Sequence, residues 1–164
     1  MLHETENPST LLKVDDYRVG FRTERGLAKA VDGVSYELDS GRTLAIVGES
    51  GSGKTVLNRG IMGLLGSNVN ESGSVQFQGE ELVNTDRQKF WGKKMAMIFQ
   101  DPMTSLNPVM KVGKQVAEPL RLHRGMSKKE ARQRTVELFT LVGIPEPSKR
   151  FDEYPHQLSG GMRQ

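Results

Sequence analysis

One short segment, Gly48–Thr55, constrains what this chain can fold into more than any other part of its sequence. It reads GESGSGKT and matches the pattern G-x-x-x-x-G-K-[ST] in full. The apolar run Thr43–Val47 precedes it, and a stretch with helical character, about Lys54 to Leu65, follows it. A glycine-rich turn with an incidental Lys-Thr pair is the plainer alternative, but the complete pattern seldom arises by chance between a strand and a helix. The segment therefore predicts a phosphate-binding loop.

Each residue type in this segment has a physical role in holding a phosphate chain. Glycines let the backbone adopt positive φ, and the resulting curl points successive N–H groups inward as an anion-binding nest. The start of the following helix adds the positive end of its dipole. Lys54 supplies a positive charge for the β- and γ-phosphates, and the Thr55 hydroxyl is a hard oxygen ligand for Mg²⁺. The residues expected to bind the nucleotide here are Gly48, Glu49, Ser50, Gly51, Ser52, Gly53, Lys54 and Thr55.

The composition narrows the classes of site that the chain can carry. It has 164 residues, which fits one domain by length, and no cysteine, which excludes disulfides, thiolate metal sites and cysteine nucleophiles. The net charge of +3 is spread among interleaved acidic and basic residues, which favours a solvated mixed-charge surface over a nucleic-acid face. The polar N-terminal residues do not resemble a secretory signal, and no run approaches the roughly 18 apolar residues of a membrane span.

The first hundred residues have the pattern of strands. Leu11–Phe21 and Ala30–Leu38 alternate between apolar and polar residues and are joined by a short polar turn, which is typical of an antiparallel pair. Ser72–Gln78 alternates in the same way. Thr43–Val47 and Met95–Phe99 are continuous apolar runs, so we expect buried strands covered on both faces.

From about Val109 the pattern becomes helical. Ser127 and Glu130 have the spacing of a capping box, in which the serine accepts from the backbone three residues on and the glutamate reaches back. Gly143 is placed where a left-handed residue ends a helix. The side chains expected on one face of this helix are Ala131, Leu138, Phe139 and Val142.

Two further motifs follow the loop along the chain. Gln100 comes directly after Met95–Phe99, and Leu158–Gln164 reads LSGGMRQ. This order resembles that of ATP-binding cassette (ABC) ATPases, with a Walker A loop, a Q-loop and a signature segment, over nearly all of the chain. Within that class the sequence resembles the ATPases of oligopeptide, dipeptide and nickel importers. The segments that carry the narrower resemblance are AVDGVS (Ala30–Ser35), VGESGSGK (Val47–Lys54), QDPMTSLNP (Gln100–Pro108) and YPHQLSGGMRQ (Tyr154–Gln164).

The resemblance implies a role for each matching residue. Phe21 matches the aromatic side chain that stacks on adenine, and a core aromatic at the end of a strand is an equal alternative on physical grounds. Gln100 matches the glutamine that contacts Mg²⁺ and the attacking water, although a neutral amide is a poor base. Lys54 and Gln100 are therefore the catalytic candidates, and Thr55 and Gln100 are the Mg²⁺ ligands that the resemblance implies.

The signature segment implies a second subunit. Ser159, Gly160 and Gly161 match the residues that bind the γ-phosphate of ATP held by the opposite protomer. The implied partner is a second ATPase subunit, in a homodimer or a heterodimer. Met162 stands where the general signature has glutamine, a departure that the peptide-importer group shares.

The resemblance also implies a fold class. It is α/β, a P-loop NTPase core of the ABC type with an N-terminal antiparallel β piece and a helical subdomain. Residues 1–164 would be the N-terminal part of one ABC ATPase domain, with a β-rich, loop-bearing core over about 10–100 and a helical subdomain over about 101–164. In the family a Walker B aspartate, a catalytic glutamate and a histidine follow the signature. The chain is therefore expected to be C-terminally truncated and to hydrolyse ATP weakly or not at all alone.

The leading hypothesis is an ATP-binding, ATP-hydrolysing subunit that energises import of peptides, or of nickel, through a membrane ABC transporter. Its cofactors would be ATP and Mg²⁺. Membrane-spanning permease subunits would be further partners, at the cytoplasmic face of the plasma (inner) membrane, with no contact to the transported substrate and none to nucleic acid. Two alternatives stay open: a nucleic-acid-linked ATPase of the same superfamily, which usually has a long insertion before the signature, and an assembly module that binds ATP without turnover.

Overall fold

The computed structural model describes residues 10–101 and 105–164 and divides the chain into two compact units, Met1–Lys89 and Phe90–Gln164. We call these the first and the second unit. Residues 102–104, which belong to the QDPMTSLNP match, lie outside the described residues. The division of the domain expected near residue 100 stays a prediction.

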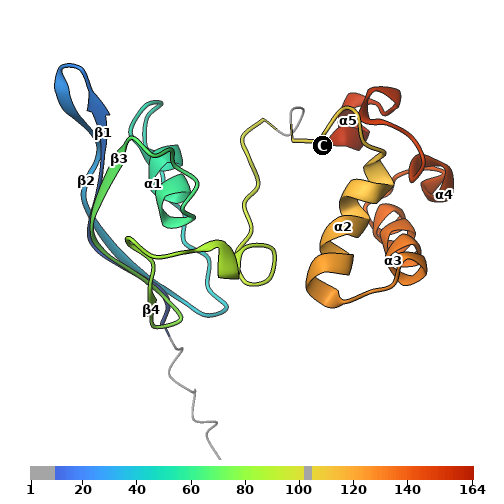
Figure 1. The fold of residues 1–164 in the computed structure, drawn as a ribbon, viewed down its shortest axis with the longest axis horizontal. Coiled ribbons are helices and arrows are strands. Elements are labelled where there is room, and N and C mark those ends of the chain that lie inside the picture. Colours follow the sequence, from blue (N-terminus) through green and yellow to red (C-terminus); the bar gives the residue numbers. More distant parts are fainter. Residues whose placement is uncertain (1–9, 102–104) are drawn as a thin grey trace, which may run out of the picture. The chain divides into compact units, whose positions relative to one another are not determined.

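The first unit is built on an antiparallel sheet (Figure 1). Its strands are β1 (Thr10–Thr23), β2 (Gly26–Asp39), β3 (Val69–Phe77) and β4 (Glu80–Glu81). They follow the order β2-β1-β3-β4, so β1 is hydrogen-bonded on both sides. A two-residue turn joins β1 to β2, because Thr23 pairs with Gly26. The predicted antiparallel pair is confirmed, and both of its strands extend beyond the predicted limits.

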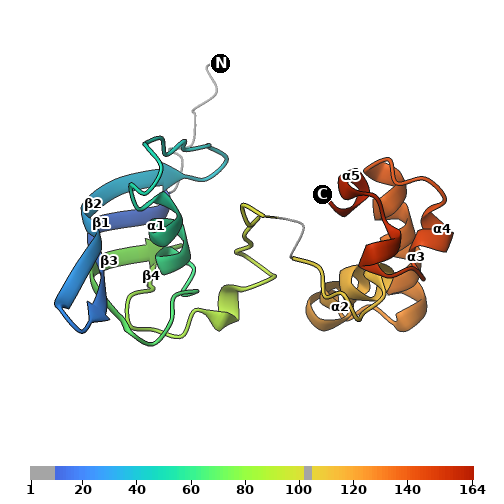
Figure 2. The same cartoon turned by 90° about the horizontal axis from the view of Figure 1, so that it is seen from above.

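Helix α1 (Lys54–Ile61) lies against one face of this sheet (Figures 1 and 2). It buries Leu57 and Ile61, which are 4% and 5% exposed. The buried residues of the sheet include Val14, Val19 and Val75, each no more than 2% exposed. Fully burying a side chain of this size contributes ~1.5–3 kcal/mol, so these contacts hold the helix that follows the phosphate loop onto the sheet.

Two strand predictions are wrong for the described structure. Thr43–Val47 has no regular secondary structure and pairs with no described strand, and Val47 is 89% exposed. Met95–Phe99 has one isolated bridge, between Trp91 and Met95, and Ile98 is 95% exposed. A strand needs a neighbour to take up its N–H and C=O groups, and an apolar run does not specify that neighbour. Apolar character therefore predicted neither the strands nor their burial.

The second unit is helical. Its helices are α2 (Val112–Arg124), α3 (Lys128–Leu141), α4 (Pro147–Arg150) and α5 (Gly160–Arg163). Two apolar clusters hold them together. One contains Val112, Phe139 and Leu158, and the other contains Ala117, Ala131 and Phe151. Among the described residues, no helix has the length and the apolar character that crossing a bilayer requires.

The local helix signals of the second unit are confirmed. Glu130 N donates to Ser127 Oγ at 3.3 Å, and Ser127 N donates to Glu130 Oε2 at 2.8 Å, which completes the capping box. Gly143 has φ of +77° just after α3. Of the side chains expected on one face of α3, Ala131 and Phe139 are buried, whereas Val142, just after the helix, is 70% exposed. Thr135 is also fully buried. The Thr135 hydroxyl donates to Ala131 O at 2.8 Å, which satisfies its polar group inside the helix.

Candidate functional site

The segment Gly48–Thr55 forms an exposed loop that enters α1 through glycines in left-handed conformations. Gly51 has φ of +82° and Gly53 has φ of +89°. Residues other than glycine rarely adopt these backbone angles. A Cβ atom on Gly53 would also overlap the carbonyl oxygen of Ala30 in β2. Glycine is thus required twice at this position, because it allows both the turn and the close approach of the loop to the sheet.

Lys54 curls back over the loop. Its Nζ donates to the carbonyl oxygens of Gly48 and Glu49, at 2.7 and 2.6 Å, and to Ser52 Oγ at 3.2 Å. The ammonium group is therefore held at the loop instead of extending into solvent. A multiply charged anion at the loop has the charge to draw this ammonium away from the two neutral carbonyl oxygens.

The start of α1 lacks the side-chain partners that usually complete a helix. Gly53 is its N-cap residue and supplies no side-chain hydrogen bond, and the first turn contains no acidic side chain. The first turn of α1 thus offers no anion of its own to the positive end of the helix dipole. Together with the glycine turn and Lys54, this arrangement fits a phosphate chain.

The Thr55 hydroxyl is the side-chain oxygen of this loop that the sequence pattern assigns to Mg²⁺. Thr55 is exposed in the first turn of α1. Among the described residues, no group of three or more His, Cys, Asp or Glu could hold a metal ion. Mg²⁺ binds proteins through few side-chain oxygens and otherwise through water and substrate phosphates. The donor set at the loop therefore fits Mg²⁺ that arrives with a nucleotide.

Phe21 lies near the end of β1 in the same unit as the loop. It is half-buried and pairs with Ala28 of β2 and Val69 of β3. Ala28 is two residues from Ala30, whose carbonyl oxygen the loop glycine approaches. Phe21 and the phosphate loop are thus placed along the same stretch of β2. Its expected role in adenine stacking stays a prediction.

Gln100 and the signature residues belong to the second unit. Gln100 is exposed. Ser159 precedes α5, and its Oγ accepts from Met162 N at 3.3 Å. A serine hydroxyl that accepts one hydrogen bond keeps its own hydrogen for another acceptor. Gly160 and Gly161 are exposed, and an added Cβ on either would meet no described atom within 4 Å outside its own stretch of helix.

The residues around the signature are fixed by the core of the second unit. Leu158 is 5% exposed in the cluster with Val112 and Phe139, and Met162 packs against that cluster. The thioether of Met162 is therefore used for packing, which explains why an apolar residue suits this place. Its backbone amide makes the polar contact instead.

Sequence reasoning missed a buried polar cluster beneath α1. It consists of Tyr17, Glu71 and Arg87, with exposed side-chain fractions of 0%, 14% and 5%. The three residues come from β1, β3 and the segment after β4. Each lies in a polar stretch of sequence without a motif, and their partners are distant in the chain. No local signal could have identified the cluster.

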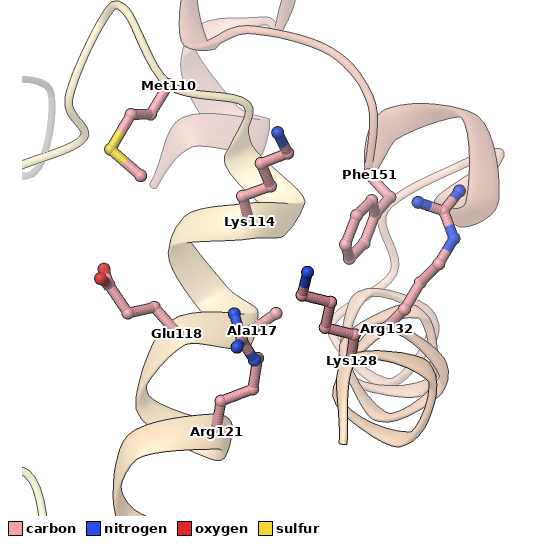
Figure 3. Close-up of a pocket in the computed structure, with 8 residues that line it drawn as sticks. All are labelled: Met110, Lys114, Ala117, Glu118, Arg121, Lys128, Arg132 and Phe151. Atoms are coloured by element: carbon pink, nitrogen blue, oxygen red, sulfur yellow. The ribbon is translucent and has the colours of Figure 1, made fainter. Parts of the chain in front are cut away.

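A pocket of about 470 Å³ lies between α2 and α3 in the second unit (Figure 3). Ala117 and Phe151 form apolar parts of its wall, and Arg132 lies over the Phe151 ring at 4.1 Å. Arg132 is also paired with Asp152. The pocket is lined by Met110, Lys114, Ala117, Glu118, Arg121, Lys128, Arg132 and Phe151. Four of these side chains are cationic and one is acidic, so the pocket favours an acidic group.

The family model described as ABC transporter matches residues 31–164, which include the loop, Gln100 and the signature segment. This chain belongs to the ABC transporter family. The oligopeptide transport ATP-binding protein OppD of Bacillus subtilis is 51% identical over 159 residues, with 94% of this chain and 44% of that protein covered. The dipeptide transport ATP-binding protein DppD of Lactococcus lactis is 49% identical, with 94% of this chain and 46% of that protein covered.

The fold is that of an ABC ATPase cassette. A dimeric ATP-binding cassette in a post-hydrolysis state, bound to ADP and Pi, superposes with a TM-score of 0.77 at 24% identity. The match covers 93% of this chain and 65% of that chain. The predicted α/β P-loop fold is confirmed, and so is the resemblance to importer ATPases. The chain spans about half the length of the curated relatives it matches.

Proposed function

We propose that this chain is part of a subunit that binds and hydrolyses ATP to drive import of peptides through a membrane ABC transporter. The observation that carries the proposal is the loop Gly48–Thr55, in which the glycine turn, Lys54 and an uncapped helix start converge. Relatives at 51% and 49% identity named for oligopeptide and dipeptide transport support the peptide class. Nickel is the alternative cargo.

The chain's own residues would bind and orient the triphosphate. Loop amides and Lys54 would hold the β- and γ-phosphates, and Phe21 would stack on the adenine. Thr55 and Gln100 would hold Mg²⁺, which when bound neutralises phosphate charge during transfer. Gln100 would also orient the attacking water through its amide, which can both donate and accept.

A second ATPase subunit would complete each nucleotide site. Ser159, Gly160 and Gly161 would face the γ-phosphate bound to the opposite protomer. The exposure of the two glycines and the free hydrogen of the Ser159 hydroxyl support this role. The dimeric form of the structural neighbour supports it as well. ATP would then join two subunits, and hydrolysis would separate them.

The second unit would contact the permease at the cytoplasmic face of the inner membrane. The pocket between α2 and α3 supports this role, since apolar walls and a cationic rim suit an amphipathic segment with acidic side chains (Figure 3). Replacing Arg121 and Lys128 together with glutamate should reduce co-purification with the permease subunits and leave ATP affinity unchanged. Arg134→Glu, away from this pocket on α3, is the matched control. Co-purification that survives the double change contradicts this docking site.

Titration of the chain with MgATP tests the nucleotide site. Lys54→Ala should weaken binding by about 10- to 150-fold, because hydrogen bonds from a charged group contribute ~1.5–3 kcal/mol. Lys129→Ala removes an exposed lysine from α3 and should have no effect. If full affinity survives Lys54→Ala combined with Thr55→Ala, the site assignment is wrong.

A further inference from the structure

The buried polar cluster connects the sheet of the first unit to the far end of α1. Arg87 Nη2 lies 2.5 Å from Glu71 Oε2, and Arg87 Nη1 donates to the carbonyl oxygen of Gly60 in the last turn of α1. Arg87 Nε donates to Leu82 O at 2.6 Å. Every nitrogen of this guanidinium group therefore has an acceptor, and one acceptor belongs to the helix that starts at the phosphate loop.

Tyr17 completes the cluster from β1. Its hydroxyl donates to Glu71 Oε1 at 3.0 Å. Burial raises the pKa of Tyr17, and the neighbouring Glu71 charge raises it further, so the hydroxyl stays protonated and remains a donor. Glu71 thus accepts hydrogen bonds at both carboxylate oxygens, which compensates its burial.

Two glycines let α1 approach the cluster closely. A Cβ on Gly60 would overlap the Tyr17 hydroxyl. Gly63 has φ of +68°, and its Cβ would lie 2.7 Å from Arg87 Cδ. At the other end of α1, Gly53 makes a similar close approach to Ala30 of β2. Both ends of this short helix are therefore fixed to the same sheet.

Stability alone does not account for a buried ion pair in this place. Removing two charges from water is costly, and a well-packed apolar substitute is often as stable or more so. The ion pair instead fixes the orientation of the groups bound to it, since the donors of a guanidinium group form a rigid planar fork. An eight-residue helix is a rigid rod about 12 Å long, so a shift at Gly60 is transmitted to the loop at its start.

We propose that Arg87 is a positioning residue for nucleotide binding, which acts with Glu71 and Tyr17 by fixing the Gly60 carbonyl and hence the orientation of the phosphate loop. The proposal rests on the nucleotide function proposed above. It assigns a role in phosphate binding to three residues that do not touch the nucleotide.

The test is a titration of the chain with MgATP and with magnesium tripolyphosphate, together with urea unfolding of each variant. Arg87→Met should lower affinity for both ligands by the same factor, about 5- to 30-fold, because the defect concerns the phosphate loop and not the adenine site. Tyr17→Phe should lower both affinities less, by about 2- to 5-fold. Lys89→Ala, which removes an exposed ion pair with Glu80 from the same segment, should change neither affinity.

A double variant separates positioning from stability. Arg87→Met leaves the buried Glu71 carboxylate without its cation, so its urea midpoint should fall. Glu71→Gln in the same chain removes that charge and should recover stability, but affinity should stay low because the Gly60 carbonyl is still not held. Affinity that recovers with stability overturns the proposal. So does an unchanged affinity in folded Tyr17→Phe and Arg87→Met chains.

The two proposals fail in different ways. If the Lys54→Ala chain binds MgATP as tightly as the wild-type chain, the nucleotide site is wrong, and the role of Arg87 is wrong with it. Binding that depends on Lys54 but is indifferent to Arg87 and Tyr17 contradicts only the positioning role.

Discussion

The helix that follows the phosphate loop begins differently from α2, α3 and α5 of the second unit. Helix α1 starts at Gly53 with no side-chain cap. Helix α3 has a complete capping box, and α5 is capped by the Ser159 hydroxyl. At the start of α2, the amides of Val112 and Gly113 donate to the carbonyl oxygens of Glu153 and Phe151, at 2.9 and 3.1 Å.

The difference shows where the chain leaves room for a ligand. The first N–H groups of any helix lack intrahelical acceptors and need partners from elsewhere. At the starts of α2 and α3 the second unit supplies these partners from its own carbonyls and side chains, so these two helix starts are structural. At α1 the side-chain partner is missing and the glycine loop curls over the gap, which leaves the positive helix end for a phosphate chain.

The largest effect should come from disturbing the start of α2. A side chain on Gly113 would overlap the ring and the carbonyl of Phe151, so Gly113→Val should destabilise the second unit by about 3 kcal/mol. Urea unfolding followed by far-UV circular dichroism measures the loss. Gly160→Ala is the control and should be neutral or slightly stabilising, because the added Cβ would meet no described atom within 4 Å outside its own helix. Equal effects of the two changes would contradict the close packing at Gly113.

The next largest effect should come from the start of α1. Gly53→Ala combines a positive φ of +89° with overlap at the Ala30 carbonyl, so it should cost about 2 kcal/mol of stability and most of the affinity for MgATP. Gly51 also has a positive φ, but a Cβ added there would meet no described atom within 4 Å beyond its chain neighbours, so Gly51→Ala should cost only about 1 kcal/mol. Titration and urea unfolding of both variants measure the difference. Identical losses would mean that the loop does not rest on β2.

Removing the cap of α3 should have a smaller effect. Ser127→Ala should lower the free energy of unfolding by about 1 kcal/mol, because the Glu130 amide loses the Ser127 Oγ that accepts its hydrogen bond. Nucleotide affinity of the folded chain should not change, since this helix start is structural. Ser127→Asp keeps a capping oxygen and should restore most of the stability. A loss of MgATP affinity in folded Ser127→Ala would break the distinction between the two kinds of helix start.

The smallest effect should be the pH dependence of stability that comes from Glu130 in the same capping box. Hydrogen bonds between Ser127 and Glu130 lower the pKa of the Glu130 carboxyl below its ordinary value of 4.5. The folded chain therefore gains stability above about pH 4.5 and loses that gain as the pH falls through the lowered pKa. Urea midpoints measured from pH 6 down to pH 3 should fall less for Glu130→Gln than for the wild-type chain. Parallel pH profiles for the two chains would contradict the capping role of the carboxylate.

The sequence by itself determined the features that depend on neighbouring residues. The loop Gly48–Thr55, the β1–β2 hairpin and the capping box of Ser127 and Glu130 each rest on contacts between residues close in the chain. Glycine tolerates positive φ in any loop, and serine can cap any helix start. Alternating apolar and polar residues likewise suit a β-strand, whose side chains point to opposite faces of the sheet. The order of the three motifs along the chain can also be read without the structure, and it was sufficient to indicate the ABC transporter family.

Only the tertiary structure decided which residues became partners over long separations. Glu71 meets Tyr17 across 54 positions and Arg87 across 16, and no pattern in the sequence joins them. Likewise, the apolar run Thr43–Val47 predicted burial that the described fold does not provide. Apolar and charged side chains accept many partners, so their burial and pairing follow from the packing of the whole chain and not from local sequence.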